Sequence, residues 1–280
     1  MPAGKKKLNT GFIKAYNNYE FLNSPAARTI RILTEMIEPR ERLRQKHIHN
    51  TVVFFGSART LPRADARRNF REAEKQFKAA ARPTASLKKK LVAAEGDLVM
   101  SRFYEDAVEL AEKLTIWFKD PTFKRRRFLV CTGGGPGIME AANRGAKKAK
   151  GESIGLNISL PLEQNPNPYQ TKDISCEFHY FFIRKFWFFY LAKAMIVFPG
   201  GFGTLDELFE LLTLVQTEKT RKYMPIVLYG KDYWNEVVNF QALVHWGMIS
   251  QEDLKLFKIC DDVDSAFAYL QAEIQKHHLR

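Results

Sequence analysis

The sequence predicts an α/β protein: a doubly wound, Rossmann-like parallel sheet with helices on both faces, preceded by an N-terminal helical extension. Three observations predict this class. From residue 51 onward, short apolar strand patterns alternate with helical patterns, as strand–helix–strand units require. Two of these strands run directly into glycine-rich turns that open helices, at residues 133–137 and 199–204. With 45% hydrophobic and 27% charged residues, the 280-residue chain has a globular composition and room for a sizeable core.

The first 50 residues are predicted to form the extension. Residues 1–23 are rich in Asn and Lys and read as a loosely ordered arm. Ser24 and Pro25 are typical of a helix start, as cap and first helical residue. We expect this helix to run to about Glu38 and to end before Pro39, because proline disrupts a helix interior.

The remaining elements follow in order from residue 51 to residue 280. The pattern predicts helices over residues 65–119, interrupted at Pro83 and around Gly96. Apolar runs bounded by turn residues predict five buried strands. These strands are 51–56, 128–132, 153–158, 194–198 and 225–229. Helical patterns are predicted at 138–149, 180–193, 205–217, 233–246 and 263–277, and a Pro/Asn loop at 161–168.

The positive charge of the chain is confined to its N-terminal third. The net charge is +13, yet residues 1–90 hold 21 Lys or Arg against 7 Asp or Glu, and residues 91–280 hold 23 against 24. The first long helix after the initial strand has many exposed basic positions, continued by Lys88–Lys90. A solvated helix face is the simplest interpretation, and a docking surface for nucleic acid is the alternative.

The cysteine content and the hydropathy of the chain indicate the cellular compartment in which we expect it. Cys131, Cys176 and Cys260 are widely spaced, without a Cys-x-x-Cys pair, which is typical of a reduced cytoplasmic protein. No signal peptide is predicted, since the lysines at 5–7 are followed by polar residues. The most apolar stretch, 186–198, is shorter than the roughly 20 residues of a membrane span. We therefore expect a cytoplasmic protein without a membrane partner.

The two glycine turns predict a binding site for a phosphorylated ligand. Ligands of open α/β sheets bind beyond the carboxyl ends of the strands, where both turns fall. Glycine lets backbone N–H groups approach a phosphate, and the following helix N-terminus favours negative charge. No Gly-Lys-Ser/Thr sequence follows either turn, and the 133–137 turn lacks the dinucleotide spacing. No cofactor and no metal are predicted.

Three charged residues stand near these turns. Glu207 lies one helical turn beyond Thr204, within reach of a ligand, although the same spacing fits a capping box. Arg184 and Lys185 are embedded in an aromatic run, where cations need an anionic partner. That partner is either a ligand or a protein carboxylate, with Glu207 as one candidate. The aromatic residues of this run are more typical of a protein core or a dimer interface than of a surface that stacks on bases.

Both glycine motifs match a known family. Gly133–Glu140 (GGGPGIME) and Pro199–Glu207 (PGGFGTLDE) closely resemble the paired motifs of the LOG ("lonely guy") family, long mislabelled lysine decarboxylases. The resemblance spans roughly Thr51 to the C-terminus. It is interrupted by a basic helical insertion at about 60–100, and this insertion and the N-terminal 50 residues resemble the longer bacterial subgroup. Lysine decarboxylation itself finds no support, since nothing marks a pyridoxal-phosphate lysine.

The resemblance implies an activity and a set of site residues. LOG proteins hydrolyse the N-glycosidic bond of cytokinin riboside 5′-monophosphates, releasing base and ribose 5-phosphate. Arg184 and Glu207 match the catalytic pair. The implied substrate-binding residues are Ser57, Gly133, Gly134, Gly135, Glu163, Lys185, Gly200, Gly201, Gly203, Thr204 and Thr213.

Three functional hypotheses remain at this stage. The first is a nucleosidase acting on AMP or N6-modified nucleoside 5′-monophosphates. The second is a broader nucleotide 5′-monophosphate nucleosidase of salvage. The third is a binding protein of the same superfamily, such as a molybdenum-cofactor carrier, against which the presence of both Arg184 and Glu207 argues. The family resemblance and the aromatic helix imply a homo-oligomer, at least a dimer, and nucleic acid is not the favoured partner.

Overall fold

The core is a seven-stranded, wholly parallel sheet in the order β4-β3-β2-β1-β5-β6-β7. The computed structural model describes residues 12–124, 126–160, 165–220 and 222–279. The strands are β1 Asn50–Phe55, β2 Phe128–Thr132, β3 Ser153–Ile158, β4 Cys176–Phe178, β5 Ala192–Val197, β6 Ile226–Tyr229 and β7 Lys258–Cys260. The chain winds outward from β1 in one direction to β4 and in the other from β5 to β7. The predicted doubly wound α/β fold is therefore confirmed.

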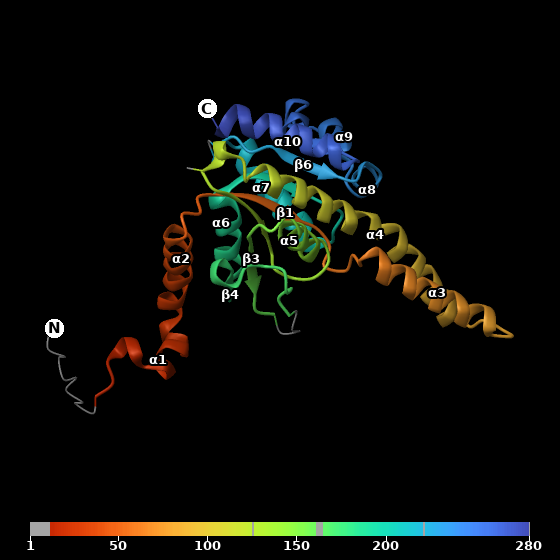
Figure 1. Cartoon of the computed structure of the whole chain (residues 1–280), viewed down its shortest axis with the longest axis horizontal. Helices are drawn as coiled ribbons and strands as arrows, with labels where there is room; N and C mark the ends of the chain where they lie inside the picture. Colours follow the sequence, from red (N-terminus) through yellow and green to blue (C-terminus); the bar gives the residue numbers. More distant parts are fainter. Residues whose placement is uncertain (1–11, 125, 161–164, 221, 280) are drawn as a thin grey trace.

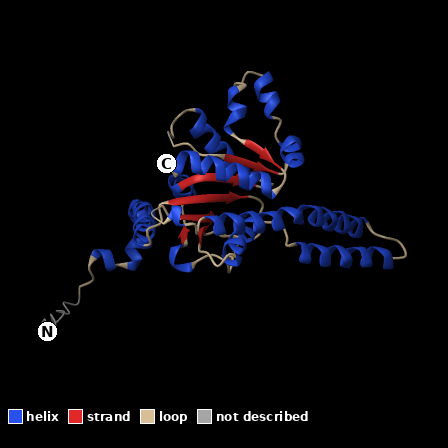
Figure 2. Cartoon of the chain, turned by 45° about the horizontal axis from the view of Figure 1, so that its top comes forward, coloured by secondary structure: helices blue, strands red, loops and turns tan. Residues whose placement is uncertain are grey.

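Helices cover both faces of this sheet (Figures 1 and 2). One apolar core lies between the sheet and α4 (Ala85–Trp117), α5 (Ile138–Lys148) and α10 (Val263–His278). The other lies under α2 (Arg28–Gln45), α6 (Phe181–Leu191), α7 (Phe202–Gln216), α8 (Lys231–Val237) and α9 (Phe240–His245). Two parts project from this body: α1 (Tyr19–Asn23) with residues 12–18, and the hairpin of α3 (Arg63–Ala79) with the first half of α4 (Figure 1).

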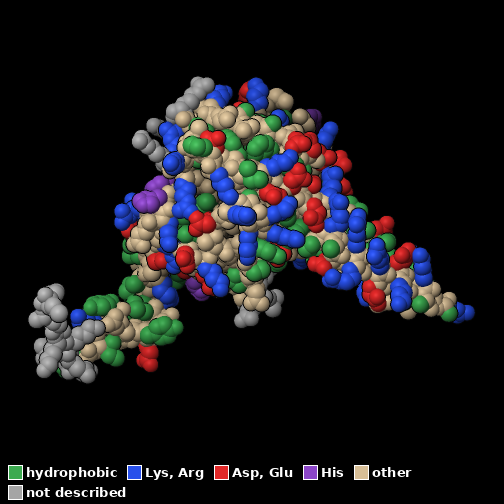
Figure 3. Space-filling model, in the orientation of Figure 1, with side chains coloured by type: hydrophobic (Ala, Val, Ile, Leu, Met, Phe, Trp, Pro, Cys, Tyr) green, Lys and Arg blue, Asp and Glu red, His purple; other side chains and the backbone are tan. Residues whose placement is uncertain are grey.

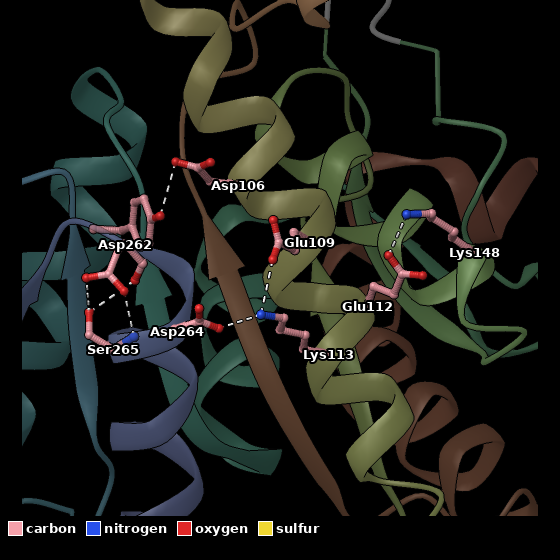
Figure 4. Close-up of polar contacts among 9 residues, drawn as sticks. Asp106, Glu109, Glu112, Lys113, Lys148, Asp262, Asp264 and Ser265 are labelled. Carbon is pink, nitrogen blue, oxygen red and sulfur yellow. Dashed lines mark hydrogen bonds and ion pairs between the residues drawn. The ribbon is translucent and has the colours of Figure 1, made fainter.

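Polar contacts tie the long helix α4 to its neighbours (Figure 4). The Tyr229 hydroxyl of β6 donates to Asp106 of α4. Lys113 of α4 pairs with Glu109 of the same helix and with Asp264 of α10. Lys148 of α5 pairs with Glu112. These contacts fix the inner half of α4 on the sheet, whereas its outer half carries the projecting hairpin.

The N-terminal helix continues where the sequence predicts its end. Pro25–Ala27 is a 3₁₀ turn, and α2 then runs through Pro39 to Gln45, so the predicted end at Glu38 is wrong. Proline lacks the N–H that would bond to the carbonyl four residues earlier, which is that of Glu35. The indole Nε1 of Trp187 donates to this Glu35 carbonyl at 3.0 Å. The packing of α6 thus satisfies the group that the proline leaves open.

A second correction concerns Gly96. The predicted interruption there is wrong, because α4 is continuous over 33 residues and includes it. A single glycine lowers helix stability by about 1 kcal/mol relative to Ala, too little to break a helix held by its neighbours. The predicted break near Pro83 is confirmed, and the Thr84 hydroxyl caps the start of α4 by accepting from the Leu87 N–H. The edge strands β4 and β7 were not predicted, since three residues are too few to show periodicity.

The described helices include none with the length and apolar character needed to cross a bilayer. The three cysteines are buried free thiols.

Candidate active site

A cavity of about 650 Å³ opens at the carboxyl ends of β1, β2 and β5. The chain reverses its winding direction between β1 and β5, and this is where open α/β sheets bind ligands. Nine of the predicted site residues line the cavity: Ser57, Gly133, Gly135, Arg184, Gly200, Gly201, Gly203, Thr204 and Glu207. Side chains that the sequence did not single out complete the wall, among them Met139, Leu160, Phe181, Phe202 and Tyr233.

The backbone of Ser57 joins the two glycine turns. Its N–H donates to the Pro199 carbonyl at 2.9 Å, and its carbonyl accepts from the Ile138 N–H at 3.0 Å. A Cβ on Gly137 would lie 2.2 Å from the Ser57 carbonyl oxygen, and one on Gly200 would lie 3.0 Å from the Ser57 nitrogen. Glycine is therefore required at both positions for the three segments to meet this closely.

A buried amide network holds the first glycine turn from behind. Asn167 Nδ2 donates to the carbonyls of Gly134 and Gly135 and to Asn143 Oδ1, at 2.9–3.0 Å. Asn143 in turn accepts from Thr132 Oγ1 at 2.7 Å. The turn is thus fixed before any ligand arrives. The sequence carries one signal for Asn143, since it is a polar residue between the apolar positions of the 138–149 helix.

The second turn leaves its backbone open to the cavity. Gly201 is the N-cap of α7, and the side chains of this end provide no cap hydrogen bond. The first N–H groups of a helix have no intrahelical partner, and those of Phe202 and Gly203 find no acceptor among the described residues. A Cβ on Gly201 or Gly203 would meet nothing within 4 Å. These two glycines leave room beside the helix N-terminus, where an anion is favoured.

The capping-box interpretation of Glu207 is wrong. The helix starts at Phe202, which makes Thr204 the third helical residue, and its N–H bonds to the Gly201 carbonyl. Glu207 is 4% exposed, and its Oε2 has no hydrogen-bond partner among the described residues. Burial raises the pKa of Glu207 to about 7, although the nearby Arg184 and Lys185 lower it.

Arg184 reaches the same cavity from α6. Its guanidinium lies over the rings of Phe181 and Phe188, at 5.1 and 5.5 Å from the ring centroids. One of its nitrogens, Nη1, would lie 3.8 Å from a Cβ on Gly133, so it borders the first glycine turn. Its Nε is buried without a partner in the described part of the chain. Burial lowers the pKa of Arg184, yet an arginine stays charged at neutral pH.

Within the described residues, the expected internal salt bridge is formed by Lys185 and not by Arg184. Lys185 Nζ pairs with Asp206 at 2.7 Å and with Glu210 at 2.8 Å, which ties α6 to α7. Burial opposes the charge, but these hydrogen bonds raise the pKa of Lys185. Lys185 is not among the residues that line the cavity.

Three other predicted site residues lie elsewhere. Gly134 is behind the cavity wall, where a Cβ would clash with Asn157 and where its N–H donates to Thr132 Oγ1. Thr213 lies further along α7, away from the cavity lining, and its hydroxyl donates to the Phe209 carbonyl. Glu163 lies outside the described residues.

Sequence comparison places the chain among known proteins. The model of the family described as "Possible lysine decarboxylase" matches residues 139–270, which contain Arg184, Glu207 and the second glycine turn. The resemblance to the LOG family is confirmed.

Two curated relatives are similar in sequence to part of this chain. The pyrimidine/purine nucleotide 5′-monophosphate nucleosidase of Escherichia coli strain K12 is 31% identical over 119 residues, which are 38% of this chain. The chain spans only 25% of the length of that relative. The cytokinin riboside 5′-monophosphate phosphoribohydrolase LOG7 of Arabidopsis thaliana is 29% identical over 152 residues, covering 53% of this chain and 64% of the relative.

Among solved structures, the molybdenum cofactor carrier protein of Chlamydomonas reinhardtii superposes with a TM-score of 0.45 at 17% identity. The superposition covers 81% of this chain and 98% of that one.

Proposed function

We propose that the chain hydrolyses the N-glycosidic bond of nucleoside 5′-monophosphates, with AMP or an N6-modified AMP as substrate. The observation that carries this proposal is the pair of Arg184 and Glu207. Both side chains face one cavity, and each keeps a buried polar atom without a partner in the described structure. Buried polar groups cost stability unless they are hydrogen-bonded, so such a pair indicates that a ligand completes the bonding.

The 5′-phosphate belongs at the second glycine turn in this proposal. There the free N–H groups of α7 and the open space at Gly201 and Gly203 form a cradle for an anion. Residues 91–280 are almost neutral overall, so capture relies on these local dipoles and on the two arginines that line the cavity, Arg59 and Arg184. A volume of about 650 Å³ suits a mononucleotide. The apolar side chains of Met139, Leu160 and Phe181 offer a surface for the base.

Glu207 supplies the carboxylate that the chemistry needs. Breaking the C1′–N bond sends its electron pair to the base and builds positive charge on the ribose. An ionised Glu207 stabilises this charge or takes a proton from the attacking water, whose oxygen bonds to C1′. The departing base gains a proton from solvent. A group with a pKa of about 7 is well matched to proton transfer near neutral pH.

The substrate range separates two versions of the proposal. The two relatives support both versions: the Escherichia coli protein is named for pyrimidine and purine nucleotide 5′-monophosphates, and the Arabidopsis protein for a cytokinin riboside 5′-monophosphate. The test is incubation with AMP, isopentenyl-AMP, GMP and CMP, followed by chromatography of the released base. Release from AMP or isopentenyl-AMP alone supports the narrow version, and release from all four supports the broad one. No release from any of them contradicts hydrolysis and favours a binding protein.

Replacing Glu207 tests the mechanism. We expect Glu207→Gln to lower kcat by about 10²–10⁴-fold, the usual contribution of a general acid or base. The wild-type kcat/KM should rise with pH through about 7 as Glu207 ionises, and the variant should lose this dependence. The matched control is Glu236→Gln, which replaces an exposed acid of α8. It should leave both kcat and the pH dependence of kcat/KM unchanged. Undiminished base release by Glu207→Gln would rule out this role.

We also propose that the active form is a homo-oligomer. Large apolar side chains are exposed on α2 and on α6, which pack against each other. They include Ile30, Leu33 and Ile37 on α2 and Phe181, Phe182, Phe186 and Tyr190 on α6. Contiguous exposed apolar surface is typical of protein interfaces. A second copy seated on α6 would border the cavity, because Phe181 also lines it.

A further inference from the structure

The hairpin of α3 and the outer half of α4 stands outside the sheet-covering cores. The buried residues that α4 contributes to the sheet-facing core start at Phe103. The part of α4 before Phe103 belongs to the hairpin, which projects away from the body (Figures 1 and 2). Its own seam is formed by residues of α3 that recur every three or four positions and pack on α4: Ala66, Phe70, Ala73 and Phe77. The hairpin is therefore an ordered arm that the α/β core does not need for its packing.

The face of α3 opposite this seam is basic. Arg67, Arg71, Lys75 and Lys78 are exposed, and at 3.6 residues per turn they fall within one quarter of the helix circumference. Arg68 borders the same face. Figure 3 shows Lys and Arg side chains along the projecting hairpin, with fewer acidic ones between them. Residues 63–90 hold ten Lys or Arg against three Asp or Glu, including Arg82 and Lys88–Lys90 near the tip.

These cations are not arranged as a solvated face usually is. Exposed helices gain stability from opposite charges four residues apart, and like charges at that spacing destabilise them. Arg67, Arg71 and Lys75 are successive like charges at this spacing, and no ion pair to any of them is found within the described residues. On the same helix, Arg68 and Lys78 do pair, with Asp65 and Glu74. Arg67, Arg71 and Lys75 thus form a row of cations without an ion pair within the described residues, although Glu72 lies beside them.

A shallow depression lies along this row. It has a volume of about 690 Å³ and is lined by four cations, Arg67, Arg68, Arg71 and Lys75, and by one acid, Glu72, together with Ala64 and Asn69. Residues four apart on a helix are about 6 Å apart along its axis, so the row presents evenly spaced cations to a partner. An elongated partner with regularly repeated negative charge fits such a row.

We propose that this basic face of the hairpin, defined by Arg67, Arg68, Arg71, Lys75 and Lys78, binds the phosphodiester backbone of nucleic acid. The aromatic side chains of α3, Phe70 and Phe77, lie in the seam with α4, so base stacking is not part of the contact. The face also lacks large apolar side chains that would insert into a membrane. Binding is therefore independent of base sequence and governed by phosphate neutralisation. The site is separate from the cavity and does not depend on its activity.

Fluorescence anisotropy with a short labelled DNA duplex, and with the RNA duplex of the same sequence, tests this proposal on the full chain. With five phosphates neutralised, the affinity should fall about 10²–10³-fold between 50 and 200 mM salt. The variant Arg67→Gln/Arg71→Gln/Lys75→Gln should bind at least tenfold more weakly at low salt. Its log–log salt slope should be shallower by roughly 2–3. Preference for one duplex identifies DNA or RNA as the source of the backbone.

The control removes the same charge elsewhere. Lys172→Gln/Lys219→Gln/Lys276→Gln neutralises three exposed cations of the body and should bind as the wild type does. Circular dichroism checks that the hairpin keeps its helical content in both variants. Equal loss of binding in the two triple variants, or no salt-dependent binding by the wild type, would overturn the proposal. Equally tight binding to polyglutamate or to phosphatidylserine vesicles would also overturn it, in favour of an acidic protein or a membrane.

Discussion

At the scale of single residues, the two glycines at the start of α7 have different tasks. Gly200 is required by packing, since a Cβ there would lie 2.1 Å from Thr204 Oγ1. Gly201 meets no such neighbour and lines the cavity, so nothing in the described fold requires glycine there. Glycine at position 201 is therefore consistent with the proposed phosphate site, where a ligand would approach the backbone closely.

This difference gives a paired prediction. Gly201→Ala should change the free energy of unfolding by no more than about 1 kcal/mol. Its methyl group should raise the KM for AMP at least tenfold, because it occupies the space of the phosphate. Gly200→Ala should instead lower stability by about 1–3 kcal/mol through overpacking. Thermal denaturation and steady-state kinetics separate the two effects. An unchanged KM in Gly201→Ala would contradict phosphate binding at this turn.

At the scale of elements, the sequence predicted the strands and turns that build the site. Continuous apolar runs ending in glycine locate β1, β2 and β5, and hence the edge where the cavity lies. The unpredicted features depend on contacts between distant residues. The passage of α2 through Pro39 requires Trp187 of α6, and the network behind the first turn requires Asn167 to meet Asn143. Local patterns carry no information on such partners.

The N-terminal extension also takes part in the site through α6. The Glu35 carboxylate of α2 accepts from the backbone N–H groups of His179 and Tyr180, at the start of α6. The other end of the arrangement is fixed by the ion pairs of Lys185 with α7. These contacts set the position of α6, which carries Arg184, relative to α7, which carries Glu207.

Lys185 therefore offers a test of positioning. We expect Lys185→Met to lower kcat about 3–30-fold with little change in KM, as loss of alignment does. The Lys185 charge also lowers the pKa of Glu207, so the acid limb of the pH–rate profile should move to higher pH. Lys185→Arg keeps the positive charge, so the acid limb of its pH–rate profile should stay at the wild-type pH. A change confined to KM would instead indicate that Lys185 contacts the substrate, as the family resemblance implies.

At the scale of the whole molecule, charge and apolar surface are divided among separate parts. The positive excess lies in residues 1–90, and the cavity is built from a nearly neutral segment together with the end of β1. The hairpin carries the basic face, whereas large apolar side chains are exposed on α2, on α6 and at residues 12–19. Figure 3 shows such apolar side chains on the N-terminal part that projects from the body. This division is consistent with the proposed surface role of the net charge and with the proposed self-association through the apolar face.

Self-association gives the whole-molecule prediction. Leu33 and Ile37 of α2 are 53% and 58% exposed, and in an oligomer a second copy covers them. Light scattering after size exclusion should give a multiple of the 32.4 kDa chain mass for the wild type. Leu33→Glu/Ile37→Glu should give the mass of one chain, because charges buried at an interface cost several kcal/mol. Val92→Glu on the hairpin, 59% exposed, is the matched control and should keep the wild-type mass. A double variant that keeps the wild-type mass would place any interface elsewhere.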